Sequence, residues 1–359
     1  MVFPGVSRVT VPAGGSAPQV CVDIGVFAYN EEAQIGALIA DLARQTIFET
    51  TEVDLQVLVL ANGCTDNTVG AAEQALAALP ETVAARIRVL DLEQGGKSRT
   101  GHRYIHELSR PSAEMLGFMD GDIRLPAPRA LLQMVQRMQA DHGLRAFSSR
   151  PVKDVVHDDL PVGTMARVIA MGGDGLTDFR KSICGQLFML RGQTARRIGL
   201  PAGLPVEDGF IRAMTLTELL SAPEDTDRID GDPEIFHVYE SIRSPLELIR
   251  HQIRIVVGTA VNAALFRRIR RDAPTEEAAH GMLMQAAEDP RWLRRILQED
   301  LPVRPYGYVP FDLLTKRLKA GPRRGLRGRV VLALGLVLDL VAWLGASWRM
   351  WRGQGAGHW

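Results

Sequence analysis

Short apolar segments alternate with helical patterns through the first third of this chain, and this alternation limits its fold more than any other feature. Apolar residues at every second position over 20–28 predict a strand, and the near-continuous apolar run over 55–61 predicts a buried parallel strand. Two more strands are predicted over 87–92 and 115–119, with helices between the strands over about 35–42, 64–79 and 98–108. Because such alternation produces right-handed crossovers, we expect an α/β fold with a doubly wound, mostly parallel sheet flanked by helices.

The second half of the chain has weaker patterns. Strands are predicted over 186–191 and 234–239, and a helix that opens with two acidic residues is predicted over 207–220. Residues 245–320 have a mostly helical pattern. The sequence therefore predicts a helical region after the sheet.

Charge and cysteine content argue against several classes of protein. Lysine and arginine number 42, as do aspartate and glutamate, so the net charge of zero gives no electrostatic basis for binding nucleic acid. The three cysteines are widely spaced, which argues against a disulfide framework and a zinc site and favours a reducing compartment. Residues 1–19 are rich in proline and glycine, unlike a signal peptide.

Polar loops follow the four predicted strands of the first third. They occupy residues 29–32, 61–66, 94–97 and 120–122. In doubly wound sheets, ligands bind beyond the carboxyl ends of the strands, where loops of this kind meet. The sequence therefore predicts the functional site at that edge of the sheet.

Asp120 and Asp122 stand two residues apart at the end of the fourth predicted strand. Two carboxylates at this spacing can converge on Mg²⁺ or Mn²⁺, which prefer oxygen ligands and often bridge protein carboxylates to phosphates. Such a cation would neutralise charge that develops on a diphosphate leaving group. The alternative interpretation is a solvated acidic turn.

Gly95, Gly96 and Lys97 directly precede the third predicted helix. Glycines let the backbone approach a ligand, and a helix amino terminus with a lysine favours an anion. A Walker A loop is excluded, because position 91 is aspartate where that motif requires glycine. The alternative is a glycine turn before a basic surface helix.

Two asparagine loops and a pair of acids complete the candidate site. The loops at Asn30 and Asn62 can hydrogen-bond a base and a ribose, or they can serve only as a helix cap and a turn. No G-x-G-x-x-G follows the first predicted strand, which argues against a dinucleotide-binding Rossmann fold. Glu207 and Asp208 can simply favour a helix amino terminus, or one can act as a general base whose pKa the other raises.

Five of these segments together resemble the family 2 glycosyltransferases of the GT-A fold, over roughly residues 20–258. The segments are VFAYNE at 26–31, NGCTDNT at 62–68, GK at 96–97, FMDGD at 118–122 and EDGF at 207–210. Each segment is short, and the resemblance depends on their occurring in the family's order.

The resemblance implies a nucleotide-diphosphate sugar donor, a divalent cation and inversion at the anomeric carbon. It implies Asp122 as a metal ligand with Asp120 near the metal and the ribose, and Asp208 as the base beside Glu207. The residues expected to bind the donor are Ala28, Tyr29, Asn30, Glu32, Asn62, Asp66, Lys97, Asp120 and Gly121.

Two departures from the family pattern limit what the resemblance implies. Residues 61–62 are Ala-Asn where the family often has two aspartates, so the donor's base stays open. The segment HQIRI at 251–255 lacks the leading glutamine and the tryptophan of the Q-x-x-R-W motif found in processive members. That difference argues against a polymer synthase.

The segment 330–348 has 19 residues and one charge, Asp339. As a helix it would be about 28 Å long, close to the ~30 Å thickness of a hydrocarbon core. Three tryptophans gather near its end, and seven lysines and arginines over 316–329 favour a catalytic domain on the cytoplasmic side. We expect this helix to span the cell membrane or lie in its interface, although a buried helix of a soluble fold is an alternative.

These interpretations divide the chain into five parts. They are an N-terminal extension (1–19), the nucleotide-sugar-binding half of the GT-A domain (20–125), its acceptor-binding and catalytic half (126–244), a helical region with a basic juxtamembrane stretch (245–328), and the membrane-associated helix and tail (329–359). We expect the acceptor to be a membrane-proximal or lipid-linked hydroxyl, as in a glycolipid, a polyprenyl-linked glycan or an envelope polysaccharide precursor. A nucleotidyltransferase on a related scaffold and a non-catalytic membrane adaptor that binds nucleotide-sugars are the alternatives.

Overall fold

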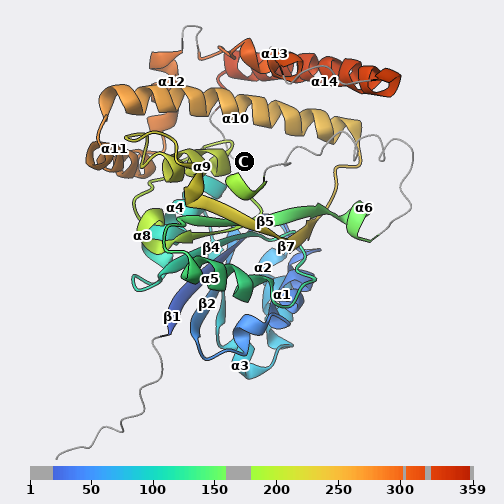
Figure 1. Ribbon diagram of the computed structural model, residues 1–359, viewed down its shortest axis with the longest axis vertical. Helices are drawn as coiled ribbons and strands as arrows, with labels where there is room; N and C mark the ends of the chain where they lie inside the picture. The colour runs from blue at the N-terminus through green and yellow to red at the C-terminus, as the bar shows by residue number, and fades with distance from the viewer. Residues whose placement is uncertain (1–18, 159–178, 302–304, 320–324, 356–359) are drawn as a thin grey trace, which may run out of the picture.

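A seven-stranded sheet forms the centre of the computed structural model, which describes residues 19–158, 179–301, 305–319 and 325–355 (Figure 1). Its strands lie in the order β3-β2-β1-β4-β6-β5-β7. Their bounds are β1 Val20–Ala28, β2 Val53–Asn62, β3 Ile87–Leu92, β4 Met115–Asp120, β5 Ala146–Lys153, β6 Leu187–Arg191 and β7 Ile229–Tyr239. All of the predicted N-terminal extension except Gln19 lies outside the described residues.

All strands but one run in the same direction. β1 pairs in parallel with β2 and β4, β2 with β3, and β5 with β7. β6 is antiparallel to both of its neighbours, β4 and β5. The prediction of a mostly parallel α/β sheet is therefore confirmed, and the amino end of β6 meets the carboxyl ends of the other strands at one edge.

Helices cover the sheet and are joined to it by two buried apolar clusters (Figure 1). One cluster unites the strands with α1 and α5, and the other unites them with α9 and the C-terminal helices. The bounds are α1 Ile35–Ala43, α2 Thr68–Ala77, α3 Glu81–Ala84, α4 Lys97–Arg103, α5 Ala130–Ala140, α6 Asp154–His157, α8 Gly192–Ala195 and α9 Glu207–Leu216. Short helical turns are η1 Thr46–Phe48, η2 Tyr104–Leu108, η3 Phe179–Lys181 and η4 Thr226–Arg228.

Helix α1 shows how an apolar stripe becomes core. Ile35, Leu38, Ile39 and Leu42 recur at helical spacing, and each is fully buried. Complete burial of a side chain of this size contributes about 1.5–3 kcal/mol. The stripe therefore fixes which face of α1 packs on the sheet.

Asn30 does not cap α1, so that alternative interpretation of its role is wrong. The helix begins at Ile35, and the residue before it, Gln34, makes no capping hydrogen bond through its side chain. Asn30 has a φ of 57°. Asparagine tolerates this left-handed conformation better than most residues, and the chain uses it to turn away from β1.

One predicted helix ends earlier than expected. The helix predicted over about 98–108 is present as α4 and the π-helical turn η2, which together run from Lys97 to Leu108, whereas α9 ends at Leu216 and not at residue 220. Residues 218–220 all have positive φ, which cannot continue a right-handed helix. Helix α5 and strand β5 were not predicted.

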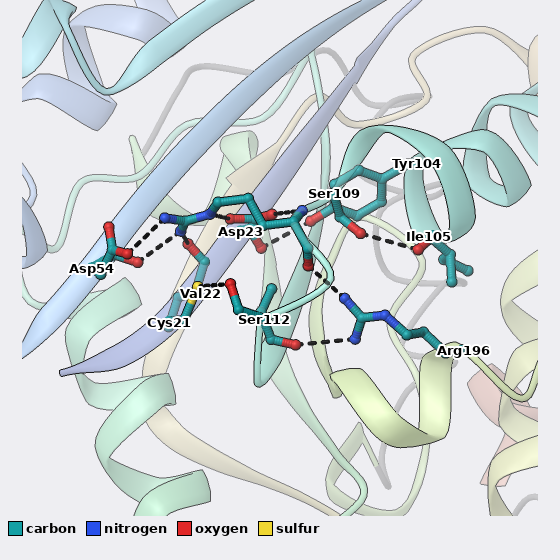
Figure 2. A network of polar contacts seen from close by, with 11 residues as sticks. Cys21, Val22, Asp23, Asp54, Tyr104, Ile105, Ser109, Ser112 and Arg196 are labelled. Carbon is teal, nitrogen blue, oxygen red and sulfur yellow. Dashed lines mark hydrogen bonds and ion pairs between the residues drawn. The ribbon is translucent and has the colours of Figure 1, made fainter. Parts of the chain in front are cut away.

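A polar network holds the far end of the α4–η2 segment against the amino ends of β1 and β2 (Figure 2). The Arg110 guanidinium contacts the buried Asp23 carboxylate at 2.7 Å and the Asp54 carboxylate at 2.7 Å. The Tyr104 hydroxyl donates to the Asp23 carbonyl oxygen at 2.8 Å, and Arg196 donates to the Arg110 carbonyl oxygen at 2.6 Å. These contacts lie at the edge of the sheet opposite the candidate site, and they fix α4 so that its amino terminus points toward that site.

The C-terminal region is helical, as predicted. It contains α10 Pro245–Asp272, α11 Glu276–Glu288, α12 Trp292–Asp300, α13 Asp312–Lys319 and α14 Gly325–Trp351. Helix α10 lies over α9, and α14 lies along α10 on the side away from the sheet (Figure 1). Within the described ranges, one helical segment, Leu332–Trp351, is long and apolar enough to cross a membrane by length and composition, which is compatible with the predicted membrane association.

Candidate active site

Lys97 joins two of the predicted acidic motifs. It is the first residue of α4, and its Nζ lies 2.6 Å from Asp120 Oδ1 and 3.1 Å from Glu207 Oε1. Burial lowers the pKa of Lys97, but the two carboxylates outweigh burial and raise it above its ordinary value. Lys97 is therefore cationic, and it holds the ends of β4 and α9 together although they are far apart in the sequence.

Asp208 lies in the first turn of α9, beside Gly185. A Cβ atom placed on Gly185 would meet Asp208 Oδ2 at 2.8 Å, so only glycine leaves this carboxylate in position. Burial raises the pKa of Asp208, and the charge of Glu207 adds to this effect, whereas Lys97 and Arg254 oppose it. A buried acid of raised pKa is a better proton acceptor than an ordinary surface aspartate.

Negative charge accumulates around Asp120 and Asp122 at the carboxyl end of β4. Burial, together with Asp122 and Glu207, raises the pKa of Asp120 to about 6 against the opposing effect of Lys97. Burial and the charges of Asp122 and Asp120 raise the pKa of the half-buried Glu31 to about 7. These shifts have the cause expected where carboxylates outnumber nearby cations.

The loops after β1 and β2 are hydrogen-bonded to each other. Asn30 Oδ1 accepts the Thr65 backbone N–H at 2.8 Å, and Asp66 Oδ2 accepts the Glu32 backbone N–H at 3.1 Å. Tyr29 is exposed at the end of β1. The structure thus brings together four of the predicted donor-binding residues in one loop pair, beside the acidic cluster.

The other predicted residues of the donor site are buried or backbone elements. Asn62 is buried, and its Oδ1 accepts a hydrogen bond from the Thr100 hydroxyl of α4 at 2.6 Å. This bond ties the Asn62 side chain to α4. The Gly121 N–H donates to the Phe27 carbonyl oxygen at 2.8 Å, and a Cβ atom at Gly121 would lie 3.0 Å from Ala28 Cβ. Close contact between these two chain segments therefore favours glycine at position 121.

Sequence reasoning missed the segment before β6 and one residue of α10. The Gly185 carbonyl oxygen accepts from Lys97 Nζ at 3.4 Å, and the Gln186 carbonyl oxygen accepts the Asp120 N–H at 2.8 Å. Gly185 stands directly before a predicted strand, but β6 is antiparallel to its neighbours, so its amino end reaches the edge of the sheet where parallel strands place their carboxyl ends. Arg254 of α10 belongs to the HQIRI segment that was compared with the Q-x-x-R-W motif, but its spacing from Asp208 in the sequence does not indicate its electrostatic effect on that residue.

The carboxylates at the end of β4 were tested as ligands of a hard divalent cation. Within the described part of the chain, no group of three or more His, Cys, Asp or Glu side chains is arranged to hold a metal ion. Asp120 and Asp122 offer oxygen ligands in a region of excess negative charge. Glu31 lies close enough for their charges to raise its pKa. Mg²⁺ and Mn²⁺ are commonly held by one or two carboxylates, with phosphates and water completing the coordination, so the donor set fits such an ion.

Comparisons with known proteins agree with this geometry. Residues 23–183 match the family model described as glycosyl transferase family 2, and no curated protein matches the chain. The mannosyltransferase PcManGT from Pyrobaculum calidifontis, solved with GDP-Man and Mn²⁺, has a TM-score of 0.50 and 16% identity over 91% of this chain and 86% of that one. That likeness shows the fold, and the predicted GT-A architecture is confirmed.

Two further solved structures are similar in part. Mannosyl-3-phosphoglycerate synthase from Rubrobacter xylanophilus has a TM-score of 0.46 and 16% identity, covering 71% of this chain and 76% of that one. Glucosyl-3-phosphoglycerate synthase from Mycobacterium tuberculosis, solved with Mg²⁺ and UDP, has a TM-score of 0.41 and 17% identity, covering 69% of this chain and 78% of that one.

Proposed function

Residues 23–183 belong to glycosyl transferase family 2, and from this premise we propose that the protein transfers a sugar, with inversion, from a nucleotide-diphosphate sugar to a hydroxyl acceptor near a membrane. The observation that carries the proposal is the contact of one lysine, Lys97, with both Asp120 and Glu207. It joins the end of β4, where a diphosphate would be neutralised, to the acids at the start of α9. Direct displacement requires the leaving group and the acceptor hydroxyl to lie next to each other, and the contact through Lys97 keeps the two motifs close together.

We propose that Asp122 and Asp120 hold a divalent cation, Mn²⁺ or Mg²⁺, and that Lys97 adds a positive charge beside it. When bound, the cation supplies charge neutralisation for the departing nucleoside diphosphate. The residues that we propose to bind the base and ribose of the donor are Ala28, Tyr29, Asn30, Glu32, Asn62, Asp66 and Gly121. The loop pair formed by Asn30 and Asp66 supports this assignment, because its exposed groups adjoin the acidic cluster.

Asp208 is the proposed general base. Its carboxylate would accept the proton of the acceptor hydroxyl as the oxygen attacks the anomeric carbon, and burial would favour that transfer by raising its pKa. Glu207, bound to Lys97, would position Asp208 and maintain its raised pKa. The displacement proceeds from the face opposite the leaving group, which accounts for inversion.

The metal role is tested by replacing Asp122 with asparagine. We expect Asp122→Asn to weaken Mn²⁺-dependent release of nucleoside diphosphate by about 100-fold or more, because the cation would lose a charged ligand. Glu73→Gln, which removes an exposed acid from α2, is the matched control and should leave release unchanged. Full Mn²⁺-dependent activity in a folded Asp122→Asn protein would refute the proposed ligand.

The base is tested by Asp208→Asn. Loss of a positioned base typically lowers the rate of chemistry about 10²–10⁴-fold, so kcat should fall by that factor while donor affinity changes little. Release of pyrophosphate from a nucleoside triphosphate, in place of nucleoside diphosphate from a nucleotide-sugar, would instead favour a nucleotidyltransferase. Unchanged kcat in Asp208→Asn would exclude this residue as the base.

We also propose that the five-part division of the chain corresponds to function. In this proposal residues 20–125 bind the donor, 126–244 present the acceptor and the base, and 245–328 connect them to the membrane-associated helix and tail at 329–359. A cytoplasmic position for the catalytic domain is supported by the basic stretch over 316–329. Residues 320–324 of that stretch lie outside the described residues.

A further inference from the structure

Helix α14 has an apolar face that nothing in the described part of the chain covers. Its large apolar side chains recur three or four residues apart and are between 40% and 61% exposed. They are Leu334, Val337, Val341, Leu344, Trp348 and Trp351. A helix on a water-exposed surface normally places polar residues on this face, so the pattern indicates contact with an apolar phase.

The opposite face of α14 is packed against the rest of the protein. Ala342, Ala346 and Met350 are buried, and a Cβ atom at Gly345 would lie 2.5 Å from Ile253 Cδ1 of α10. The Trp343 indole N–H donates to the Pro310 carbonyl oxygen at 3.3 Å, close to the start of α13. Helix α14 therefore cannot change its angle to the membrane unless α10 and the segment before α13 move with it (Figure 1).

The composition of α10 decides between the two orientations left open by the sequence. Arg250 and Arg254 flank Ile253, the residue that contacts Gly345 inside the candidate span. If α14 crossed the bilayer in this packing, both arginines would be carried to the depth of the hydrocarbon core, where arginine is among the costliest side chains. An orientation in the membrane plane keeps α10 in water.

We propose that α14 lies flat in one leaflet of an anionic membrane, with the Leu334–Trp351 face in the acyl region and α10 above it. Charge complementarity comes from the sequence, in which positions 316, 317, 319, 327 and 329, over α13 and the start of α14, are all lysine or arginine. Basic residues beside an apolar helix face attract anionic headgroups, and the tryptophans near the carboxyl end favour the interface.

This placement also sets the distance from the membrane to the base, and in this respect it rests on the proposed function. Ile253 of α10 faces α14, whereas Asn262, nearly opposite on the same helix, donates from Nδ2 to the Val206 carbonyl oxygen at 3.1 Å, just before α9. Two helix-to-helix spacings of about 10 Å then put the axis of α9, the helix of Asp208, roughly 20 Å from the axis of α14. A headgroup that projects from the lipid surface, rather than a soluble acceptor, matches that distance.

Depth measurements on the full-length protein test the orientation. Single variants Leu334→Cys, Val341→Cys and Trp348→Cys would be labelled with bimane and bound to vesicles of equal parts phosphatidylcholine and phosphatidylglycerol. Quenching by lipids labelled at shallow and deep positions then gives the depth of each site, with the unsubstituted protein as background. A flat helix predicts three equal, shallow depths.

Two other results would overturn the proposal. A central position at 341 that is about 10 Å deeper than both ends would show a spanning helix. Absence of quenching at all three positions would show that this face does not enter the bilayer.

Vesicle binding provides an independent measurement. The double variant Val341→Ser/Leu344→Ser should lower vesicle affinity about tenfold or more, as should vesicles without phosphatidylglycerol. Val156→Ser, at an apolar residue of α6 that is 69% exposed, is the matched control and should bind like the wild type. Unchanged affinity in the double variant would contradict the proposed face. Release of nucleoside diphosphate without vesicles, measured on the same samples, separates failure of this inference from failure of the proposed function.

Discussion

Removal of the Lys97 ammonium group should destabilise the protein and its donor site together. Methionine has nearly the same length as lysine and no charge, so Lys97→Met removes the contacts at 2.6 Å to Asp120 and 3.1 Å to Glu207 with little change in packing. Both carboxylates would remain in place without their cation. Their side chains are only 22% and 17% exposed, so water would compensate poorly.

The size of the effect follows from burial and distance. At an effective dielectric constant of about 20, a unit charge at either distance is attracted by roughly 5–6 kcal/mol. Desolvation of the three charges cancels much of this attraction, and removal of one partner from a buried pair typically costs 3–5 kcal/mol. Because the Lys97 side chain is 29% exposed, we expect the free energy of unfolding to fall by about 3 kcal/mol at neutral pH.

Urea unfolding of wild type, Lys97→Met and Arg103→Met provides the test. Arg103 lies on the same helix and pairs with Glu107 at 2.9 Å, but its side chain is 36% exposed, so its loss should cost less than about 1 kcal/mol. Lys97→Met should also lose affinity for nucleoside diphosphate with Mn²⁺, whereas Arg103→Met should not. Equal stability of the two variants would refute the reasoning from buried charge.

Two further predictions concern Glu31 and Gly185. The folded-state pKa of Glu31, about 7, exceeds its ordinary value of 4.5, so the unfolded state releases this proton at a lower pH than the folded state. Without metal, the free energy of unfolding should therefore fall as pH rises from 4.5 to about 7. In urea unfolding with EDTA, the free energy of unfolding of Glu31→Gln should depend less on pH than that of the wild type. An unchanged pH dependence would exclude Glu31 as its source. Gly185→Ala should displace Asp208 and lower kcat about tenfold or more with a small change in stability. A Cβ atom at Gly281 would meet nothing within 4 Å, so the control Gly281→Ala should leave kcat unchanged. Equal kcat in both variants would contradict the proposed contact.

The strands and loops of the first third were predictable because their signals are local. The apolar runs at β1, β2, β3 and β4 are long enough to specify buried strands, and the structure has them within two residues of the predicted bounds. Parallel strands bring their carboxyl ends together, so the proximity of the loops that contain Asn30 and Asp66 followed from topology alone.

The remaining contacts of the site join residues that are far apart in the sequence, so no local sequence pattern predicts them. Strand β5 is buried by β6 and β7, which come later in the chain, and its sequence AFSSRPVK has no clear alternation. The reversal of β6 depends on its pairing with β4 and β5, so the approach of Gly185 to Asp208 could not be inferred from spacing. Arg254 reaches Asp208 only because α10 folds over α9.

The charge balance of the site explains why its motifs are useful only together. The described residues around it include five carboxylates that influence one another and two cationic side chains, Lys97 and Arg254. The carboxylates belong to Glu31, Asp120, Asp122, Glu207 and Asp208. This excess raises the pKa of Asp120 and Glu31, and it would equally repel the diphosphate of a donor. In the proposed function, added positive charge must therefore accompany the donor, and the same excess would favour Asp208 as the proton acceptor.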